Sequence, residues 1–190
     1  MSDAGDWLLF SYSVPKNPST VRVALWRRLR DLGVLYIAPS VCLLPASAGR
    51  AGSLEACRQI AFDAGGTARL LPIHVADAEA NGALIEEFRA LRAAEYGELL
   101  ERAEAMLTEL SRESEGGKFI FAELEENEDE LEKLEKWHKR IAARDVLGSP
   151  DKEPSSTALQ RCRDALALFR DTTVAREMDF EERGTGTVRE

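Results

Sequence analysis

The sequence is poor in the residues that build disulfide frameworks and metal centres. Its 190 residues include only three cysteines and two histidines. Cys42, Cys57 and Cys162 are odd in number, lie far apart and form no CxxC pair, so we expect three buried thiols in a reducing compartment. His74 and His138 have no cysteine or second histidine at zinc-ligand spacing, so we expect no metal site and no resident cofactor.

Long hydrophobic runs are also missing. The longest early run covers residues 7–10 and is too short to span a bilayer. It also lacks the basic leader and the small-residue cleavage site of a signal peptide. We therefore expect a cytoplasmic protein that does not bind a membrane.

The common catalytic signatures are absent. The sequence contains no GxSxG, HExxH, GxGxxG or P-loop pattern. Cys42 falls in an expected strand without an obvious base, which argues against a nucleophile. The many carboxylates after residue 95 follow helical charge patterning, and the acidic run 123–132 is most simply a solvated helix face. We therefore expect no enzymatic activity.

Positive charge is concentrated near the N-terminus of an otherwise acidic chain. The formal net charge is −9 and the pI is near 4.9. Residues 1–76 contain eight Lys or Arg against five Asp or Glu, a net charge of +3, whereas the remainder contains seventeen against twenty-nine, a net charge of −12. Such an asymmetry indicates a nucleic-acid or other anionic partner for the first part.

Short apolar runs alternate with amphipathic segments in the first part of the chain. The expected strands are 7–14, 34–37, 41–44 and 67–75, and Pro72 suggests that the last one lies at a sheet edge. The expected helices are 19–31, capped by Ser19 or Thr20, and 54–64. The order β-α-β-β-α-β predicts an α+β protein with a ferredoxin-like domain over residues 5–76.

The rest of the chain has helical periodicity. Three apolar stripes repeat every three or four residues, and Gly116-Gly117 and residues 148–156 separate them. This pattern predicts a three-helix, antiparallel, coiled-coil-like region over residues 80–178. Residues 179–190 show no pattern, and we expect a flexible tail there.

The first expected helix combines arginines with a tryptophan. Arg22, Trp26 and Arg30 are spaced by four and line one flank, and Arg27 also points outward. Arg28 lies close to the apolar side of the helix, where we expect that it could pair with an acid instead.

Two interpretations of this helix remain open from the residues alone. Its basic flank is either a solvated face in which aliphatic stems shield Trp26, or a surface that contacts phosphates. In the second case Lys16 and Ser19 would add an anion site at the positive helix N-terminus.

A second basic patch lies inside the acidic half. It consists of Lys136, Lys139, Arg140 and Arg144. We expect these residues mainly to pair with neighbouring acids such as Glu132 at i,i+4 spacing. His138 falls on the apolar stripe of the same helix and is expected to be a packed residue.

Two stretches resemble a known family. WLLFSYSVP and PSTVRVALWRRLRDLGVLYIAPSVCLLP are similar to the N-terminal domain of ChrB, the bacterial chromate-resistance regulator family, in which a strand ending in Ser-x-Pro precedes a helix of the form RVxxWRRLRxLG. Trp137, Arg140 and Arg144-Asp145 match the later pattern W-x-x-R-I-x-A-R-D. The likeness covers residues 7–170, and the sequence also resembles, distantly, the ferredoxin-like domain of the PaaX regulators.

The resemblance implies a transcription regulator that binds promoter DNA and responds to chromate, a tetrahedral oxyanion that the helix arginines would hold as they hold phosphate. Three departures predict altered or absent sensing in a stand-alone relative or a partner of a second protein. We expect the chain to lack the family's further C-terminal domain, Ser40 stands where we expect glycine, and Cys42 stands where an aromatic residue is usual.

We therefore expect a regulator that binds double-stranded DNA through Arg22, Arg27 and Arg30 and forms a homodimer, because palindromic sites favour two-fold symmetric proteins. The alternative is a protein–protein interaction module that acts through its helical arm, which the net charge of −9 favours. A metal-dependent nuclease is less consistent with the sequence, since residues 11–13 read Ser-Tyr-Ser where ferredoxin-like nucleases carry an aspartate for the metal.

Overall fold

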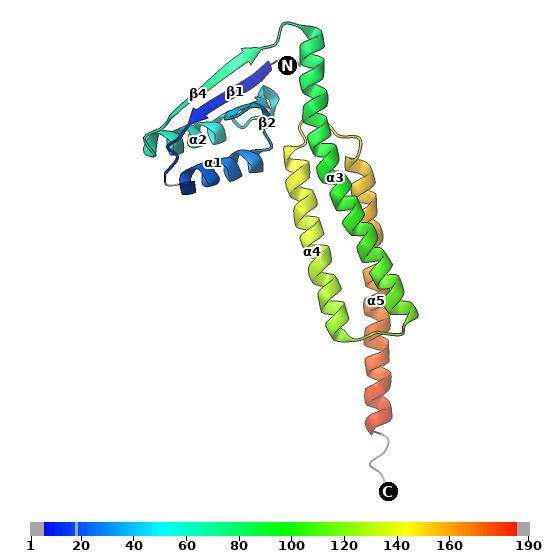
Figure 1. Ribbon diagram of the computed structural model, residues 1–190. Helices are drawn as coiled ribbons and strands as arrows, with labels where there is room; N and C mark the ends of the chain where they lie inside the picture. The colour runs from blue at the N-terminus through cyan, green and yellow to red at the C-terminus, as the bar shows by residue number, and fades with distance from the viewer. Residues whose placement is uncertain (1–5, 18, 186–190) are drawn as a thin grey trace. The chain divides into compact units, whose positions relative to one another are not determined.

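The computed structural model describes residues 6–17 and 19–185, with side chains up to Asp179 (Figure 1). This part of the chain is a mixed α+β structure with one four-stranded sheet and five α-helices. It divides into two compact units. The sheet unit comprises the chain up to Arg92 together with Ala143–Ser149, and the helical unit comprises Ala93–Ala142 and the residues from Pro150 onward.

The sheet is antiparallel throughout. Its strands are β1 (Asp6–Ser13), β2 (Leu35–Ala38), β3 (Val41–Pro45) and β4 (Thr67–His74). They lie in the order β2-β3-β1-β4, and each neighbouring pair runs in opposite directions. β4 is therefore an edge strand, as Pro72 indicated, because proline cannot donate a ladder hydrogen bond.

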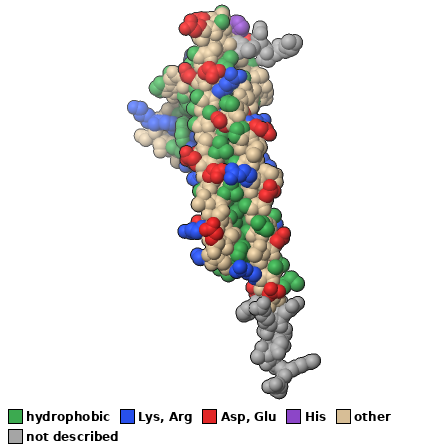
Figure 2. All heavy atoms as spheres, turned by 90° about the vertical axis from the view of Figure 1, so that its right-hand side faces the viewer, with side chains coloured by type: hydrophobic (Ala, Val, Ile, Leu, Met, Phe, Trp, Pro, Cys, Tyr) green, Lys and Arg blue, Asp and Glu red, His purple; other side chains and the backbone are tan. Residues whose placement is uncertain are grey.

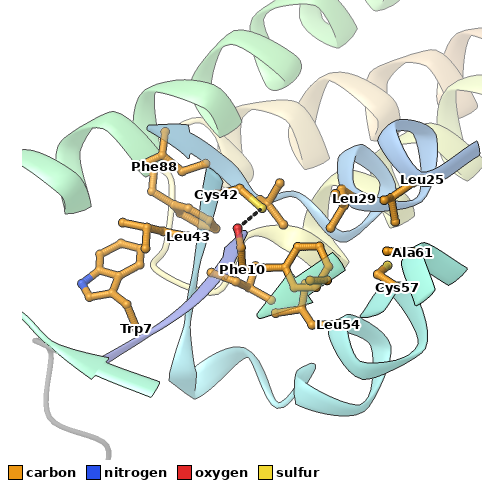
Figure 3. Close-up of a cluster of buried hydrophobic side chains, with 14 residues drawn as sticks. Trp7, Phe10, Leu25, Leu29, Cys42, Leu43, Leu54, Cys57, Ala61 and Phe88 are labelled. Carbon is orange, nitrogen blue, oxygen red and sulfur yellow. Dashed lines mark hydrogen bonds between the residues drawn. The ribbon is translucent and has the colours of Figure 1, made fainter. Parts of the chain in front are cut away.

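Two helices cover one face of this sheet. They are α1 (Ser19–Leu32) and α2 (Ala51–Asp63), and the short 3-10 turn η1 (Ala46–Ala48) precedes α2. Leu25 and Leu29 of α1 and Leu54 of α2 are buried near Phe10 and Cys42 of the sheet (Figure 3). All strands and helices expected before residue 76 are present, with ends that differ by at most three residues.

The opposite face of the sheet is partly covered by the start of α3 (Ala78–Glu115). Side chains alternate along a strand, so Trp7 points away from the Phe10 face. The Trp7 ring packs edge-on against Phe88, with 6.2 Å between centroids, and its Nε1 donates a hydrogen bond to Asn81 Oδ1 at 2.9 Å. The first turns of α3 therefore belong to the sheet unit.

The helical unit contains the rest of α3, α4 (Phe121–Arg144) and α5 (Lys152–Thr185). Most of its buried apolar side chains are those of the three predicted stripes: Tyr96, Leu99, Met106, Leu110, Leu124, Leu134, Ile141, Leu159, Cys162, Leu166 and Phe169. The Arg163–Glu135 and Arg170–Glu128 ion pairs show that α5 runs antiparallel to α4. None of the described helices is both long and apolar enough to cross a membrane.

The C-terminal end differs from the expectation of a tail that starts at residue 179. α5 continues to Thr185, so residues 179–185 are helical, while 186–190 lie outside the described residues. The apolar stripe ends near Phe169, but helical backbone hydrogen bonds continue without it, and no glycine or proline interrupts the chain before Gly184.

The three cysteines are buried free thiols, as expected. Burial raises the pKa of the Cys42 thiol to about 12 and that of Cys162 to about 11. These groups are therefore neutral at physiological pH and unsuited to act as nucleophiles.

Candidate nucleic-acid interface on helix α1

Helix α1 is oriented by the burial of Leu25 and Leu29. These two side chains anchor one side of the helix in the core. The residue that follows each of them in the sequence therefore faces solvent. The helix ends at Gly33, whose φ of +77° suits glycine. The amides of Gly33 and Val34 donate to the carbonyls of Arg30 and Leu29, which is the Schellman pattern of a helix C-terminus.

The exposed side of α1 is basic and aromatic. We name the α1 basic surface by its members, which are all exposed: Arg22, Trp26, Arg27, Arg28 and Arg30. The Trp26 side chain is 45% exposed, and the Arg30 guanidinium lies over its ring with 4.8 Å between Cζ and the centroid. The predicted packing of an arginine on Trp26 is therefore present, and it shields only part of the indole.

The arginines of the α1 basic surface lack acidic partners among the described side chains. Within residues 6–17 and 19–179, no carboxylate forms an ion pair with Arg27, Arg28 or Arg30. Arg22 donates a hydrogen bond from Nη2 to the Pro15 carbonyl at 3.4 Å, which leaves its other donors free for a ligand. The surface thus presents four guanidinium groups to solvent.

Arg28 belongs to this surface, although its position near the apolar side suggested an ion pair. Its side chain is exposed, and its charge acts on the buried Cys57 thiol. Burial raises the pKa of Cys57, and the nearby Arg28 opposes that rise in part.

Lys16 and Ser19 are exposed at the start of α1. The helix begins at Ser19, so Ser19 and Thr20 lie within it and neither is the predicted cap that precedes it; Pro18 lies outside the described residues. Both predicted anion-site residues are therefore at the expected end of the helix, near its positive dipole end.

The second basic patch is not a single surface of one unit. Lys136 Nζ lies 2.7 Å from Glu132 Oε1, which confirms the expected i,i+4 pairing for this residue. Lys139 and Arg140 are exposed on α4 in the helical unit, whereas Arg144 belongs to the sheet unit, half-buried against Gly33.

His138 is a packed residue, as its place on the stripe predicted. Its Nε2 lies 3.3 Å from Ser156 Oγ, and its ring is 5.9 Å from that of Tyr96. Burial lowers the pKa of the imidazole, so it is neutral at physiological pH.

A groove between α3 and α4 in the helical unit concentrates acids. It has a volume of about 420 Å³; half of its lining residues are glutamates, and Arg102, Lys133 and Asn127 are among the others. Glu113 is only 3% exposed and accepts a hydrogen bond from Asn127 Nδ2 at 3.0 Å. Burial, followed by a hydrogen bond with Glu123, raises the pKa of Glu113. No three carboxylate, histidine or cysteine side chains in the described chain are grouped to hold a metal ion.

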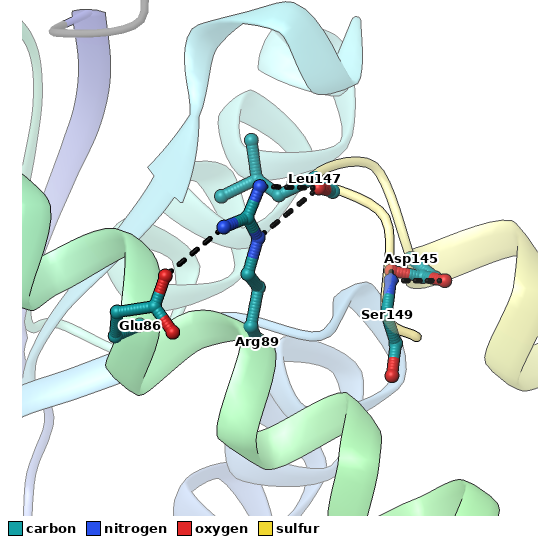
Figure 4. A network of polar contacts seen from close by, with 5 residues as sticks. All are labelled: Glu86, Arg89, Asp145, Leu147 and Ser149. Carbon is teal, nitrogen blue, oxygen red and sulfur yellow. Dashed lines mark hydrogen bonds and ion pairs between the residues drawn. The ribbon is translucent and has the colours of Figure 1, made fainter. Parts of the chain in front are cut away.

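Sequence reasoning missed a set of arginines around the segment Ala143–Ser149. Arg89 donates from Nε and Nη2 to the Leu147 carbonyl at 3.3 and 3.2 Å, and its Nη1 pairs with Glu86 at 3.0 Å (Figure 4). Both carboxylate oxygens of Asp145 accept the Ser149 amide. The contact between Arg89 and Leu147 joins residues that are 58 positions apart, and no local pattern identifies it.

Comparison with known proteins matches residues 22–180 to the family model described as "Protein ChrB, N-terminal". The chain belongs to the ChrB family. A protein of Cupriavidus metallidurans named "Protein ChrB" is 29% identical over an aligned length of 167 residues, and the match covers 80% of this chain and 50% of that protein. The chain therefore spans about half the length of this ChrB relative.

The structure accounts for two features of the ChrB resemblance. Ser40, where we expected glycine, has a φ of +59°, a left-handed conformation that glycine adopts most easily. Arg144 and Asp145 of the W-x-x-R-I-x-A-R-D pattern end α4 in the segment that packs within the sheet unit. In this ChrB chain their observed contacts are structural.

Proposed function

We propose that the chain is a non-enzymatic, DNA-binding transcription regulator of the chromate-resistance type. Membership of the ChrB family supports a role in chromate resistance. The observation that carries the DNA proposal is the α1 basic surface, because its exposed arginines lack acidic partners among the described side chains. We propose a cytoplasmic homodimer as the active form.

The proposed architecture is ferredoxin-like, with a coiled-coil-like helical region. The strand order β2-β3-β1-β4, with α1 and α2 on one face, supports the first part. The continuous apolar stripes of α3, α4 and α5 support the second. In this arrangement α1 is an outer helix of the sheet unit and is accessible to a large ligand.

The spacing of the arginines suits a DNA backbone. Arg22 and Arg30 are eight residues apart, which corresponds to about 12 Å along a helix. This span is similar to the major-groove width of about 12 Å, so the two ends of the surface would reach phosphates on both sides of one groove. Arginine forks match phosphate oxygens and would fix the position of the protein on double-stranded DNA.

A gel shift on the DNA upstream of the chain's own gene tests the proposal. The wild-type chain should bind with an affinity that falls steeply with salt, since each neutralised phosphate releases counterions. Arg22→Ala combined with Arg27→Ala should weaken binding strongly, whereas Arg112→Ala, an exposed arginine of α3, should leave it unchanged. Binding that is insensitive to the double substitution or to salt would refute the proposal.

An oxyanion effector is a further part of this proposal. Chromate would bind the same arginines and Lys16, because a tetrahedral dianion needs the same donors as phosphate. The two ligands would then compete. Calorimetry with chromate and sulfate should show heat of binding, and titrating chromate into the DNA complex should release DNA.

A second candidate function is a protein–protein interaction module, and one observation favours it. The helical unit exposes large apolar side chains, among them Leu168, which is 71% exposed. Figure 2 shows hydrophobic side chains gathered along the helices on one face of this unit. This function predicts no salt-dependent DNA binding, and the gel shift separates the two.

Incubation with Mg²⁺ and labelled DNA tests the remaining nuclease alternative, for which we expect no cleavage.

A further inference from the structure

Arg50 lies at the start of α2 but uses its side chain elsewhere. Its carbonyl accepts the amides of Ser53 and Leu54, so its backbone begins the helix. Its side chain forms no cap hydrogen bond within α2. The preceding residue, Gly49, ends η1 with a φ of +63°, a left-handed conformation that glycine adopts easily.

The guanidinium of Arg50 joins the C-terminal ends of two other helices. Its Nη1 donates to the carbonyl of Leu32, the last residue of α1, at 2.9 Å. Its Nη2 donates to the carbonyl of Ala143 in the last turn of α4. Carbonyls at helix C-termini lack partners within the helix and carry the negative end of the dipole, so one cation satisfies two such groups.

Two effects disfavour the charged form of the Arg50 guanidinium at this position. Burial, followed by the nearby charge of Arg144, lowers the pKa of the Arg50 guanidinium. The group nevertheless stays charged, because the pKa of arginine lies far above neutral pH. The two carbonyls therefore offset the cost of bringing a second cation to this place.

The ends that Arg50 joins are also in close contact. A Cβ atom on Gly33 would lie 2.5 Å from Arg92 Nη1 and 3.0 Å from Cβ and Cδ of Arg144. The turn after α1 thus has no room to shift toward the end of α4. Val146 and Leu147 pack on the core of the sheet unit beyond this point, and Arg89 holds the Leu147 carbonyl (Figure 4).

We infer that Arg50 is a positioning residue that couples α1 to the segment Ala143–Ser149. This segment links α4 to α5 in the chain, and its residues belong to the sheet unit. A change at the α4–α5 junction reaches the α1 basic surface through Arg50. This effect on ligand binding rests on the proposed DNA function, whereas the coupling itself does not.

Hydrogen exchange on the full chain tests the coupling without DNA. In Arg50→Ala, peptides that cover residues 28–36 and 143–149 should exchange about tenfold faster, because the carbonyls at both helix ends lose a charged donor. Arg50→Lys keeps the charge but not the fork, and should change both peptides less. Arg58→Ala is the matched control, since this α2 arginine contacts Glu55 and Phe62 of its own helix and should change neither peptide.

The pattern of exchange separates coupling from a local role in α2. If Arg50→Ala speeds exchange only within residues 50–63, or leaves both distant peptides unchanged, the inference is wrong. Circular dichroism and thermal unfolding of each variant establish that the fold is intact. If Arg50→Ala does not fold, the exchange rates of the same two peptides in Arg50→Lys and Arg58→Ala test the inference instead.

DNA binding provides a readout that a direct contact would change differently. Arg50→Ala should weaken binding about fivefold or more while the slope of log K against log salt stays that of the wild type. Arg27→Ala should instead reduce the slope by about 0.9, the loss of one phosphate contact. A reduced slope in Arg50→Ala, or unchanged affinity in a wild type that binds DNA, overturns the positioning role. If the wild type binds no DNA, the proposed function is wrong, and the hydrogen-exchange rates are then the test of the coupling.

Discussion

The guanidinium of Arg30 lies over the indole of Trp26, with 4.8 Å between Cζ and the ring centroid. The two residues are one helical turn apart on the solvent side of α1, so this contact forms within the helix itself. Such a cation–π contact at an exposed site contributes about 0.5–1 kcal/mol. It also fixes the planar arginine fork on the surface of the helix, which lowers the entropy that Arg30 loses when it binds an anion.

Removing Arg30 should expose Trp26 without unfolding the protein. In Arg30→Ala the collisional quenching of tryptophan fluorescence by acrylamide should increase, since Trp7 is buried and Trp137 half-buried. The same substitution in a Trp26→Phe background should leave quenching unchanged, because the remaining tryptophans are not its partners. Equal quenching in Arg30→Ala and the wild type would mean that Arg30 does not cover the ring in solution.

Ser40→Gly should stabilise the protein. Ser40 has a φ of +59° in the turn between β2 and β3, and its carbonyl accepts the Tyr12 amide, an interaction that glycine retains. A non-glycine residue in this conformation is strained, so we expect the free energy of unfolding to rise by about 0.5–1 kcal/mol. Urea unfolding measures this as a higher midpoint with an unchanged slope.

Ser53→Gly is the control for this substitution. Ser53 lies in the first turn of α2, where glycine has no conformational advantage and raises the entropy of the unfolded chain that folding must overcome. This variant should therefore be less stable than the wild type. If both serine-to-glycine changes destabilise the protein, the strain at Ser40 is too small to matter.

The stripes, the strand order along the chain and the outward side of α1 could be predicted because they depend on local periodicity. Leu25 and Leu29 fix the orientation of α1, and their spacing of four is visible in the sequence. The exposure of Arg28 was less certain, because it lies near the edge of the apolar stripe, where small rotations of a helix decide between burial and solvent. The structure places it in solvent.

The role of Arg50 could not be predicted, because it depends on contacts between residues distant in the sequence. Leu32 and Ala143 lie 18 and 93 positions away. Their carbonyls are ordinary backbone groups, and no residue type marks them. Arg144 illustrates the same limit, since its charge suggested a basic patch on α4, while tertiary packing places it against Gly33.

Two glycines with left-handed backbones should respond differently to alanine. Gly33 and Gly49 have φ values of +77° and +63°, but only Gly33 has atoms near the place of a Cβ, whereas Gly49 has none within 4 Å. Gly49→Ala should cost about 1–2 kcal/mol for the backbone strain alone. Gly33→Ala should cost clearly more, because Arg92 and Arg144 must also shift.

Urea or thermal unfolding of the two variants measures this difference. Circular dichroism of both variants at low temperature establishes that each starts from a folded state. Equal losses for Gly33→Ala and Gly49→Ala would show that the turn after α1 is not tightly packed, which would also weaken the case for a rigid link between α1 and the end of α4.

The buried carboxyl of Glu113 should make stability depend on pH. Burial and the hydrogen bond with Glu123 raise its pKa above the ordinary value of 4.5, so the folded state binds this proton more tightly than the unfolded state. The favourable contribution of the protonated form is complete below the ordinary pKa and is lost as the pH rises through the raised one. Glu113→Gln keeps an oxygen for Asn127 but cannot ionise, so its free energy of unfolding should exceed that of the wild type at pH 8 and match it at pH 4.

Glu132→Gln should behave in the opposite way, because Lys136 lowers the pKa of Glu132. A constant difference between Glu113→Gln and the wild type from pH 4 to pH 8 would show that Glu113 titrates as an ordinary surface glutamate.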